Sequence, residues 1–275
     1  DTSLTPGGSS GGEAAAIAGF MSAGGMGSDG GGSIRWPAHC CRIAGLKPAP
    51  GRVPATGHVP ECLHPSGLLG VVGPMARSTA DLAVLFEAVA GYDPSDPFSS
   101  PAPVRPAPDV LPPVALADCW PLEESVRARL HAAARVLRAE PRLPPMLHGA
   151  FGRAHELWRF FFWHPLALEW FQEARAQPEP TAHELLVHLA ARDRLRAYVL
   201  DAMNQFPVLL CAPATIEAFP HGDRARFSLD CVRPLTFANV LGLPALVTST
   251  GVQLVGRPFE EEILLAAGQR LEEAA

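Results

Sequence analysis

Glycine is concentrated near the start of this chain, and that concentration constrains the local fold more than any other feature. The first 33 residues hold 11 of the 25 glycines in a sequence of 275 residues. They fall in two runs that also carry serine, GGSSGG at 7–12 and SDGGGS at 28–33. Because glycine loses much conformational entropy on folding, such clustering indicates backbone that turns sharply or approaches another group closely. Three explanations follow: a phosphate-binding loop, a nucleophile turn or a flexible linker.

The composition of the chain narrows the function classes. Hydrophobic residues make up 48% of the sequence, enough for a substantial core, and the net charge is −6. A negative balance argues against a nucleic-acid surface, which requires clustered positive charge. No apolar run is long enough to cross a bilayer and the first residues resemble no signal peptide, so membrane association is not favoured. The six cysteines form no C-x-x-C pair, which favours reduced thiols in a cytoplasmic protein.

Hydrophobic periodicity and capping residues predict alternating helices and strands. We expect helices over 13–23, 78–90, 122–139, 181–203 and 259–272, and strands over 112–118, 206–214 and 251–256. In the helix over 78–90, Ser78 or Thr79 is the expected N-cap, and apolar residues recur on one face after it. Glycine and proline between 24 and 60 predict short strands and ordered loops, and the proline-rich stretch 93–113 predicts a surface connection. This alternation predicts an α/β architecture in which helices cover both faces of a sheet.

Three short motifs match known sites only in part. GMGSDG at 25–30 has the glycine spacing of a dinucleotide-binding loop, but a predicted helix precedes it and Ala-Pro-Gly stands where the acidic residue should follow. GGSSG at 7–11 matches a hydrolase nucleophile elbow but lacks the buried strand that leads into one. In HELLVH at 183–188 the two histidines lie about 140° apart around a helix, too far for one zinc ion. We therefore expect no metal and no cofactor.

A much longer pattern explains both glycine runs. GGSSGG is followed by an alanine-rich stretch, then by GSDGGGSIRWPA at 27–38, AGLKP at 44–48 and GRVPA at 51–55. The pattern continues through GPMARSTADLAVLFEAVAG at 73–91 and, more loosely, through NVLGLPALV at 239–247 and GVQLVGRPFEEEILLAAGQRLE at 251–272. In these features the chain resembles the amidase signature family, whose members hydrolyse carboxylic amides with a serine–serine–lysine triad. The resemblance implies that family's α/β fold, a mixed central sheet covered by helices on both faces.

The resemblance assigns a role to each glycine–serine run. Ser33 falls on the nucleophile of the family, and Ser9 falls on the bridging serine, whose preceding peptide bond is cis in the family. The backbone N–H groups of Gly30, Gly31, Gly32 and Ser33 would line the oxyanion hole, where a Cβ would intrude beside the developing negative oxygen. A neutral lysine would take the proton of the nucleophile through the bridging serine.

Four further residues belong to the matching motifs. Asp29 and Arg35 flank the nucleophile with opposite charges, and we expect them to pair and hold the loop rather than to act in the reaction. Ser10 is expected to support the site. Lys47, the only lysine of the sequence, occupies a framework position of the family within AGLKP and is not expected to be the base.

The chain departs from the family pattern in two ways. The catalytic lysine of the family lies some tens of residues before the bridging serine, whereas only eight residues precede Ser9 here. The family also places a Pro/Gly-rich segment between the GLPALV and GVQLVG motifs, where this chain has only residues 248–250. We therefore expect residues 1–275 to form a single amidase signature domain that lacks an N-terminal segment and some internal loops.

The resemblance implies an amidohydrolase that cleaves the C–N bond of carboxylic (acyl or aryl) amides, with a small-molecule substrate, through a seryl acyl-enzyme. One alternative is an amidotransferase subunit that acts on charged tRNA with a partner, although HPSGLLGVVGP at 64–74 lacks the Asp-Gln pair of those relatives. Another is a catalytically incomplete fragment, and the sequence leaves a homodimer open. The aromatic run WRFFFWHPLALEWF at 158–171 either packs in the core or lines an acyl pocket that favours apolar amides.

Overall fold

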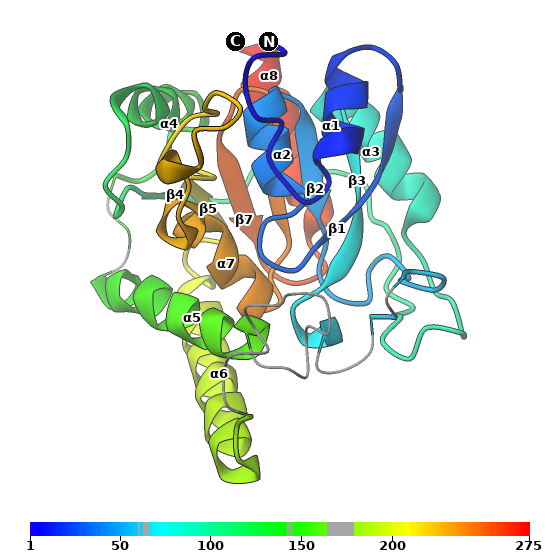
Figure 1. The fold of residues 1–275 in the computed structure, drawn as a ribbon, viewed down its shortest axis with the longest axis vertical. Helices are drawn as coiled ribbons and strands as arrows, with labels where there is room; N and C mark the ends of the chain where they lie inside the picture. The colour runs from blue at the N-terminus through cyan, green and yellow to red at the C-terminus, as the bar shows by residue number, and fades with distance from the viewer. Residues whose placement is uncertain (60, 63–65, 142, 144, 164–178) are drawn as a thin grey trace.

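The chain forms a mixed sheet, seen in a computed structural model that describes residues 1–59, 61–62, 66–141, 143, 145–163 and 179–275. Within these residues seven strands are arranged in the order β1-β3-β2-β6-β7-β5-β4 (Figure 1). The strands are β1 Gly24–Asp29, β2 Ala44–Lys47, β3 Val71–Ala76, β4 Val114–Ala117, β5 Val208–Cys211, β6 Ala245–Val247 and β7 Gln253–Gly256. Neighbouring strands are antiparallel except β4 and β5, which are parallel.

Helices cover both faces of this sheet, as Figure 1 shows. Those described are α1 Gly11–Ala18, α2 Arg35–Cys41, α3 Thr79–Val89, α4 Glu124–Leu137, α5 Pro145–Trp163, α6 Ala182–Ala202, α7 Arg233–Val240 and α8 Glu261–Glu273, with short 3-10 turns at Ser66–Leu68, Arg224–Arg226 and Leu229–Val232. Helices α3, α4 and α8 share one core with the sheet, while α1, α2 and α7 lie on the opposite face. The predicted fold class is therefore confirmed.

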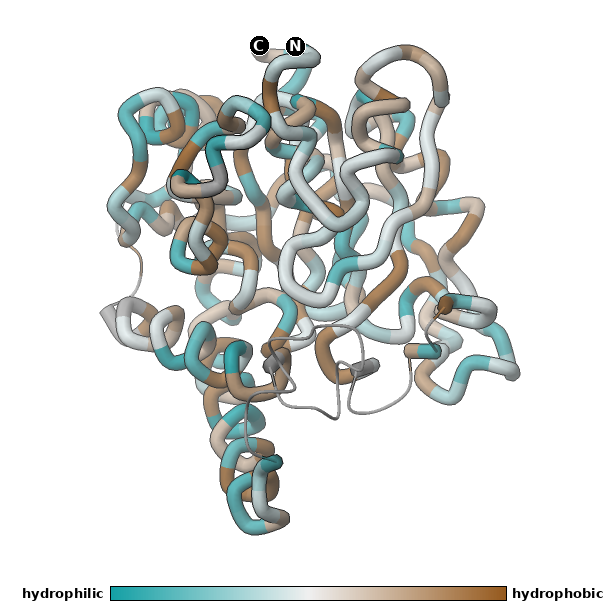
Figure 2. Tube along the Cα trace, in the orientation of Figure 1, coloured by the Kyte–Doolittle hydropathy of each residue, from teal (hydrophilic) through white to brown (hydrophobic). Residues whose placement is uncertain are grey.

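The strands supply side chains to both faces. Leu209 and Leu210 are adjacent in β5, yet they belong to different cores, and the same is true of Leu254 and Val255 in β7. Successive side chains of a strand point to opposite faces, so a strand buried on both sides is continuously apolar. Figure 2 shows hydrophobic stretches along the strands and alternating hydrophilic and hydrophobic segments along α6.

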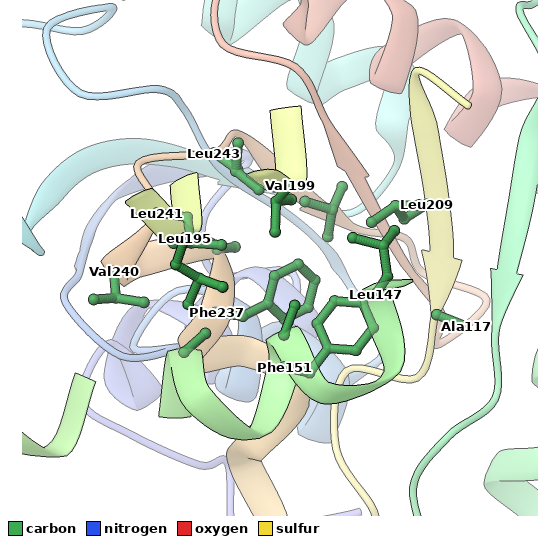
Figure 3. Packing of buried hydrophobic residues seen from close by; sticks show 14 of the residues in the cluster. Ala117, Leu147, Phe151, Leu195, Val199, Leu209, Phe237, Val240, Leu241 and Leu243 are labelled. Carbon is green, nitrogen blue, oxygen red and sulfur yellow. The ribbon is translucent and has the colours of Figure 1, made fainter. Parts of the chain in front are cut away.

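The largest hydrophobic core anchors helix α5. Phe151 of α5, Leu195 and Val199 of α6, and Phe237 of α7 point toward one another in Figure 3. The rings of Phe151 and Phe237 lie 4.6 Å apart between centroids. Because α5 is anchored here, its C-terminal half is held against the loop that follows β1.

Most predicted elements lie where periodicity put them, with a few exceptions. Helix α3 begins after Ser78, whose side chain accepts a hydrogen bond from Asp81 N, so Ser78 rather than Thr79 is the N-cap. Helix α1 covers 11–18 instead of 13–23, because Gly19 follows it and Phe20 adopts a left-handed φ of 59°. Helices α2, α5 and α7 were not predicted. Helices α2 and α7 each contain a proline, which argues against a helix in a sequence-based prediction. In both helices this proline lies in the first turn, where it costs no helical hydrogen bond.

Among the described residues, none of the helices combines the length and the apolar character that crossing a bilayer requires.

Candidate active site

The two glycine–serine runs meet at one cavity of about 720 Å³. Ser9, which comes just before α1, and Ser33, which lies between β1 and α2, both line it. Ser10 N donates a hydrogen bond to Ser33 O at 3.1 Å, so the backbones of the two runs are joined directly. The peptide bond between Gly8 and Ser9 is cis, as the resemblance implies for the bridging serine.

A buried ion pair holds the loop that carries Ser33. Asp29 and Arg35 are fully buried, and the Arg35 Nε and Nη2 atoms donate to the Asp29 carboxylate at 3.0 and 3.1 Å. The same carboxylate accepts hydrogen bonds from the backbone N–H groups of Gly32 at 2.7 Å and Ile34 at 3.2 Å. The expected pairing is confirmed, and it fixes the turn from both sides of Ser33.

The charge of Asp29 is stabilised despite its burial. Burial alone would raise the pKa of this carboxyl, but the Arg35 guanidinium and the Asn239 amide together hold the pKa well below its usual range. Asp29 therefore stays ionised at neutral pH and continues to accept hydrogen bonds from these donors.

Two polar residues from the last part of the sequence complete this network. Asn239 Nδ2 donates to the Asp29 carboxylate at 2.9 Å and to the Asp29 backbone oxygen at 3.0 Å, and Asn239 Oδ1 accepts from Arg35 at 2.6 Å. Gln253 Oε1 accepts from Arg35 Nη1 at 2.7 Å. Neither residue was predicted to belong to the site. The available signal was a polar residue inside an otherwise apolar buried stretch, because such a side chain needs a buried partner.

Not every expected N–H donor of the loop is available. The Gly32 N–H is used by Asp29. In the part of the chain that the structure describes, the N–H groups of Gly30, Gly31 and Ser33 find no acceptor. Gly31 and Ser33 line the cavity, where their N–H groups are available to a negatively charged oxygen, and Gly30 directly precedes them in the loop.

The glycines at 31 and 32 are required by close packing. A Cβ on Gly31 would lie 2.5 Å from Cζ2 of Trp158, and one on Gly32 would lie 2.5 Å from Cδ1 of Leu235. Gly32 also has a φ of +113°, which side chains rarely adopt. Helices α5 and α7 therefore press directly on the loop, a reason for glycine that adds to the one expected from the oxyanion hole.

The wall of the cavity is largely aromatic. Besides the glycines and serines, the lining includes five aromatic and two aliphatic side chains, Trp36, Trp158, Phe162, Phe219, Phe227, Leu229 and Val232. His221 is the only acidic or basic side chain among the described lining residues. An apolar wall of this kind retains an apolar ligand, since burial of its surface is favourable.

The aromatic run at 158–171 is divided between two surroundings. Trp158 and Phe162 line the cavity, whereas Phe161 is buried in the main core and Phe160 stacks on His188. The side chain of Trp163, together with Trp170 and Phe171, lies outside the described residues. One part of the run therefore packs in the core, and another part faces the cavity.

Lys47 has the framework role expected of it. Its Nζ donates to the backbone oxygens of Pro48 and Leu243, each at 2.9 Å, and the side chain is fully buried away from the cavity lining. Burial, followed by the nearby Arg35 charge, lowers the pKa of this amine to about 7. Both carbonyl contacts direct Lys47 into the fold and not toward Ser9.

The partial motifs behave as ordinary structure. Residues 25–29 of GMGSDG lie in edge strand β1, which leaves no loop there to surround a phosphate. His183 and His188 lie on α6, and His188 Nδ1 is hydrogen-bonded to Glu184 O at 2.8 Å. Across the described ranges, no three His, Cys, Asp or Glu side chains are grouped so that they could hold a metal ion.

Comparisons with known proteins identify relatives of this chain. The model of the family described as Amidase matches residues 1–118. Over its whole length the chain is 31% identical to an indoleacetamide hydrolase of Bradyrhizobium japonicum, of which it spans 67%. Over 98% of its length it is 31% identical to a glutamyl-tRNA(Gln) amidotransferase subunit of Chloroflexus aggregans, of which it spans 66%.

Structural comparison gives the same result. A solved amidase structure aligns with the whole chain and with 68% of its own chain, at a TM-score of 0.76 and 27% identity. The chain thus spans about two thirds of the length of each of these three relatives. Its fold and its sequence likeness show that it belongs to the amidase signature family of hydrolases.

Proposed function

We propose that this protein hydrolyses aryl or other apolar carboxylic amides through a seryl acyl-enzyme. The observation that carries the proposal is that Ser9 and Ser33 line one cavity with unpaired backbone N–H groups and aromatic walls. A nucleophile, a neighbouring hydroxyl and oxyanion donors are the parts that acyl transfer needs. No cofactor is required for this chemistry.

The proposed reaction has two halves. Ser33 Oγ attacks the amide carbonyl while its proton passes to Ser9, and the N–H groups of Gly30, Gly31 and Ser33 stabilise the negative oxygen. The C–N bond then breaks, the departing amine takes a proton, and an ester links the acyl group to Ser33. Water attacks this ester, which releases the carboxylic acid and restores the Ser33 hydroxyl.

The base that relays the proton is not Lys47 in this proposal. Its Nζ is held by two carbonyls and does not line the cavity. The family resemblance implies a different lysine in contact with the bridging serine.

The preference for aryl substrates rests on the cavity wall. Trp36, Trp158, Phe162, Phe219 and Phe227 surround a volume that accommodates a bicyclic ring. One similar protein is named indoleacetamide hydrolase, and the indole in that name is a bicyclic ring. Burial of one ring contributes on the order of 2–3 kcal/mol, so kcat/KM for an aryl acetamide should exceed that for acetamide by about 100-fold. Equal values for the two amides would refute the substrate assignment.

The nucleophile is tested by covalent labelling. A fluorophosphonate should react at Ser33 Oγ with loss of fluoride, and mass spectrometry of the digested protein locates the adduct. Ser33→Ala should abolish labelling and Ser9→Ala should slow it by at least about 100-fold, as expected for members of one catalytic unit. Ser28→Ala, in the neighbouring strand β1, is the matched control. Labelling at Ser9 with Ser33 unmodified would contradict the assignment.

One alternative function has support from the comparisons. The similarity to an amidotransferase subunit covers nearly the whole chain. That function predicts glutaminase activity that appears only with partner proteins and charged tRNA. Hydrolysis of aryl amides by the isolated protein, without glutaminase activity, distinguishes the proposed function from this one.

A further inference from the structure

The indole of Trp158 contacts the loop of Ser33 in two ways. Its Nε1 donates a hydrogen bond to the backbone oxygen of Gly30 at 2.8 Å. Its six-membered ring lies so close to Gly31 that a Cβ there would be 2.5 Å from Cζ2. Trp158 is 2% exposed, and its ring stacks on Phe162 and His155 with centroids 4.5 and 5.7 Å away. The orientation of the indole is therefore fixed from several sides.

The hydrogen bond to Gly30 O also determines the direction of the next N–H. The only cis peptide bond among the described residues is Gly8–Ser9, so the Gly30–Gly31 peptide is trans. In a trans peptide unit the carbonyl and the following N–H point in opposite directions. Because Trp158 holds the Gly30 carbonyl, the Gly31 N–H must point away from the indole nitrogen. Gly31 lines the cavity beside Ser33.

The other two available donors are oriented in the same manner by different groups. Asn239 Nδ2 binds the Asp29 oxygen at 3.0 Å, which turns the Gly30 N–H away from Asn239. The backbone N–H of Trp36 binds the Gly32 oxygen at 2.6 Å, which turns the Ser33 N–H away from α2. Each unpaired N–H of the loop thus follows a carbonyl that has a fixed partner.

We propose that Trp158 is a positioning residue of the oxyanion hole, which acts by holding the Gly30–Gly31 peptide so that the Gly31 N–H faces the developing negative oxygen. This inference rests on the proposed function of Ser33. It distinguishes Trp158, whose indole N–H binds the loop of Ser33, from Trp36, whose bond to this loop comes from its backbone N–H. A preorganised donor stabilises the transition state more than it stabilises the bound substrate. Loss of the Trp158 hydrogen bond should therefore lower kcat more than it changes KM.

The test compares two tryptophans of the same cavity. Trp158→Phe keeps an aromatic wall but removes the N–H that binds Gly30. Trp36→Phe, the matched control, makes the same change in a side chain that also lines the cavity, and it leaves the backbone bond to Gly32 intact. In the full-length protein we measure the rate of fluorophosphonate labelling of Ser33, and kcat and KM for an aryl acetamide. Thermal unfolding of each variant verifies that it is folded.

The expected result is a split between the two variants. Trp158→Phe should lower the labelling rate and kcat about tenfold with KM changed less than about threefold, since one of three donors is loosened but not removed. Trp36→Phe should act mainly on KM and should lower kcat less than Trp158→Phe does. Trp158→benzothienylalanine replaces the N–H by sulfur at nearly constant volume, and it should reproduce the loss in kcat even if the phenylalanine variant unfolds.

Three outcomes decide the inference. If the wild-type protein is labelled at Ser33 and the Trp158 variants change only KM, Trp158 is merely part of the wall and the inference is overturned. If benzothienylalanine retains the wild-type kcat, the hydrogen bond has no role in catalysis. If the wild-type Ser33 does not react at all, the proposed function fails, and the inference fails with it.

Discussion

Replacing Arg35 by methionine should destabilise the protein by about 3–5 kcal/mol, the usual cost of leaving one partner of a buried ion pair unpaired. Both side chains of the pair are inaccessible to solvent, so water cannot replace the lost contacts of Asp29. Arg35 also donates to Leu235 O at 3.0 Å, to Gln253 at 2.7 Å and to Asn239 at 2.6 Å. These acceptors lose a donor too, which supports the upper part of the range.

Arg42→Met is the matched control for this change. The Arg42 guanidinium binds Glu217 at 2.7 Å, but its side chain is 39% exposed. Water and salt screen such a pair, so its loss should cost only about 0–1 kcal/mol. Urea unfolding followed by circular dichroism gives the free energy of unfolding of both variants from the midpoint and the slope.

The pH dependence adds a second, independent measurement. In the wild-type protein the folded pKa of Asp29 lies below its unfolded value, so its contribution to stability is present above about pH 4 and is lost as the pH falls further. In Arg35→Met, burial without the guanidinium raises that pKa above the unfolded value, and protonation then favours the folded state. The stability difference between the two proteins should therefore be largest near neutral pH and shrink toward about pH 4.

Two results would refute this reasoning. A loss from Arg35→Met no larger than that from Arg42→Met would mean that the buried pair contributes little. A stability difference that does not change between neutral and acidic pH would mean that the ionisation of Asp29 is not coupled to Arg35.

Three further predictions concern single contacts. Gly31→Ala should lower the free energy of unfolding by about 1–3 kcal/mol through overpacking, whereas Gly30→Ala, whose nearest atoms would be 4.0 Å away, should leave it nearly unchanged. In the wild-type protein the stability should rise above about pH 7, because the folded Lys47 binds fewer protons there than the unfolded one. Lys47→Met should abolish this rise, and urea unfolding at two pH values measures it. Phe162→Ala should raise KM for aryl amides and lower the melting temperature less than Phe161→Ala, which removes a buried core ring and should cost about 3–5 kcal/mol of stability. An equal fall in melting temperature for both phenylalanine variants would contradict the division of this aromatic run.

Local signals in the sequence were sufficient for part of this structure. The cap at Ser78 and the apolar face after it identified α3, because both depend on neighbours within one turn. The motif also predicted that Ser9 and Ser33 meet, although no short-range rule connects residues so far apart. Helix α2 was missed because glycine and proline around it suggested loops, and tertiary packing on β2 and β6 overrides that preference.

The supports of the site were beyond local prediction. Asn239 contacts Asp29 across 210 positions of the chain, and Gln253 contacts Arg35 across 218. Neither contact produces a periodic pattern in the sequence, because each joins a single side chain to a residue that is distant along the chain. The aromatic wall is also assembled from separate segments, with Trp36 from α2 and Phe219 and Phe227 from the segment before α7.

These long-range contacts determine when the site can form during synthesis. Strand β2 has β6 as one of its two neighbours. Asn239 binds the Asp29 oxygen just before the loop of Ser33, and Gln253 binds Arg35 just after it. A chain that leaves the ribosome from its N-terminal end presents Ser33 first and the residues that support its loop last. The surroundings of Ser33 therefore stay incomplete until nearly the whole described chain has emerged. In refolding experiments, fluorophosphonate reactivity at Ser33 should accordingly appear with the final recovery of native structure, after the helices have formed.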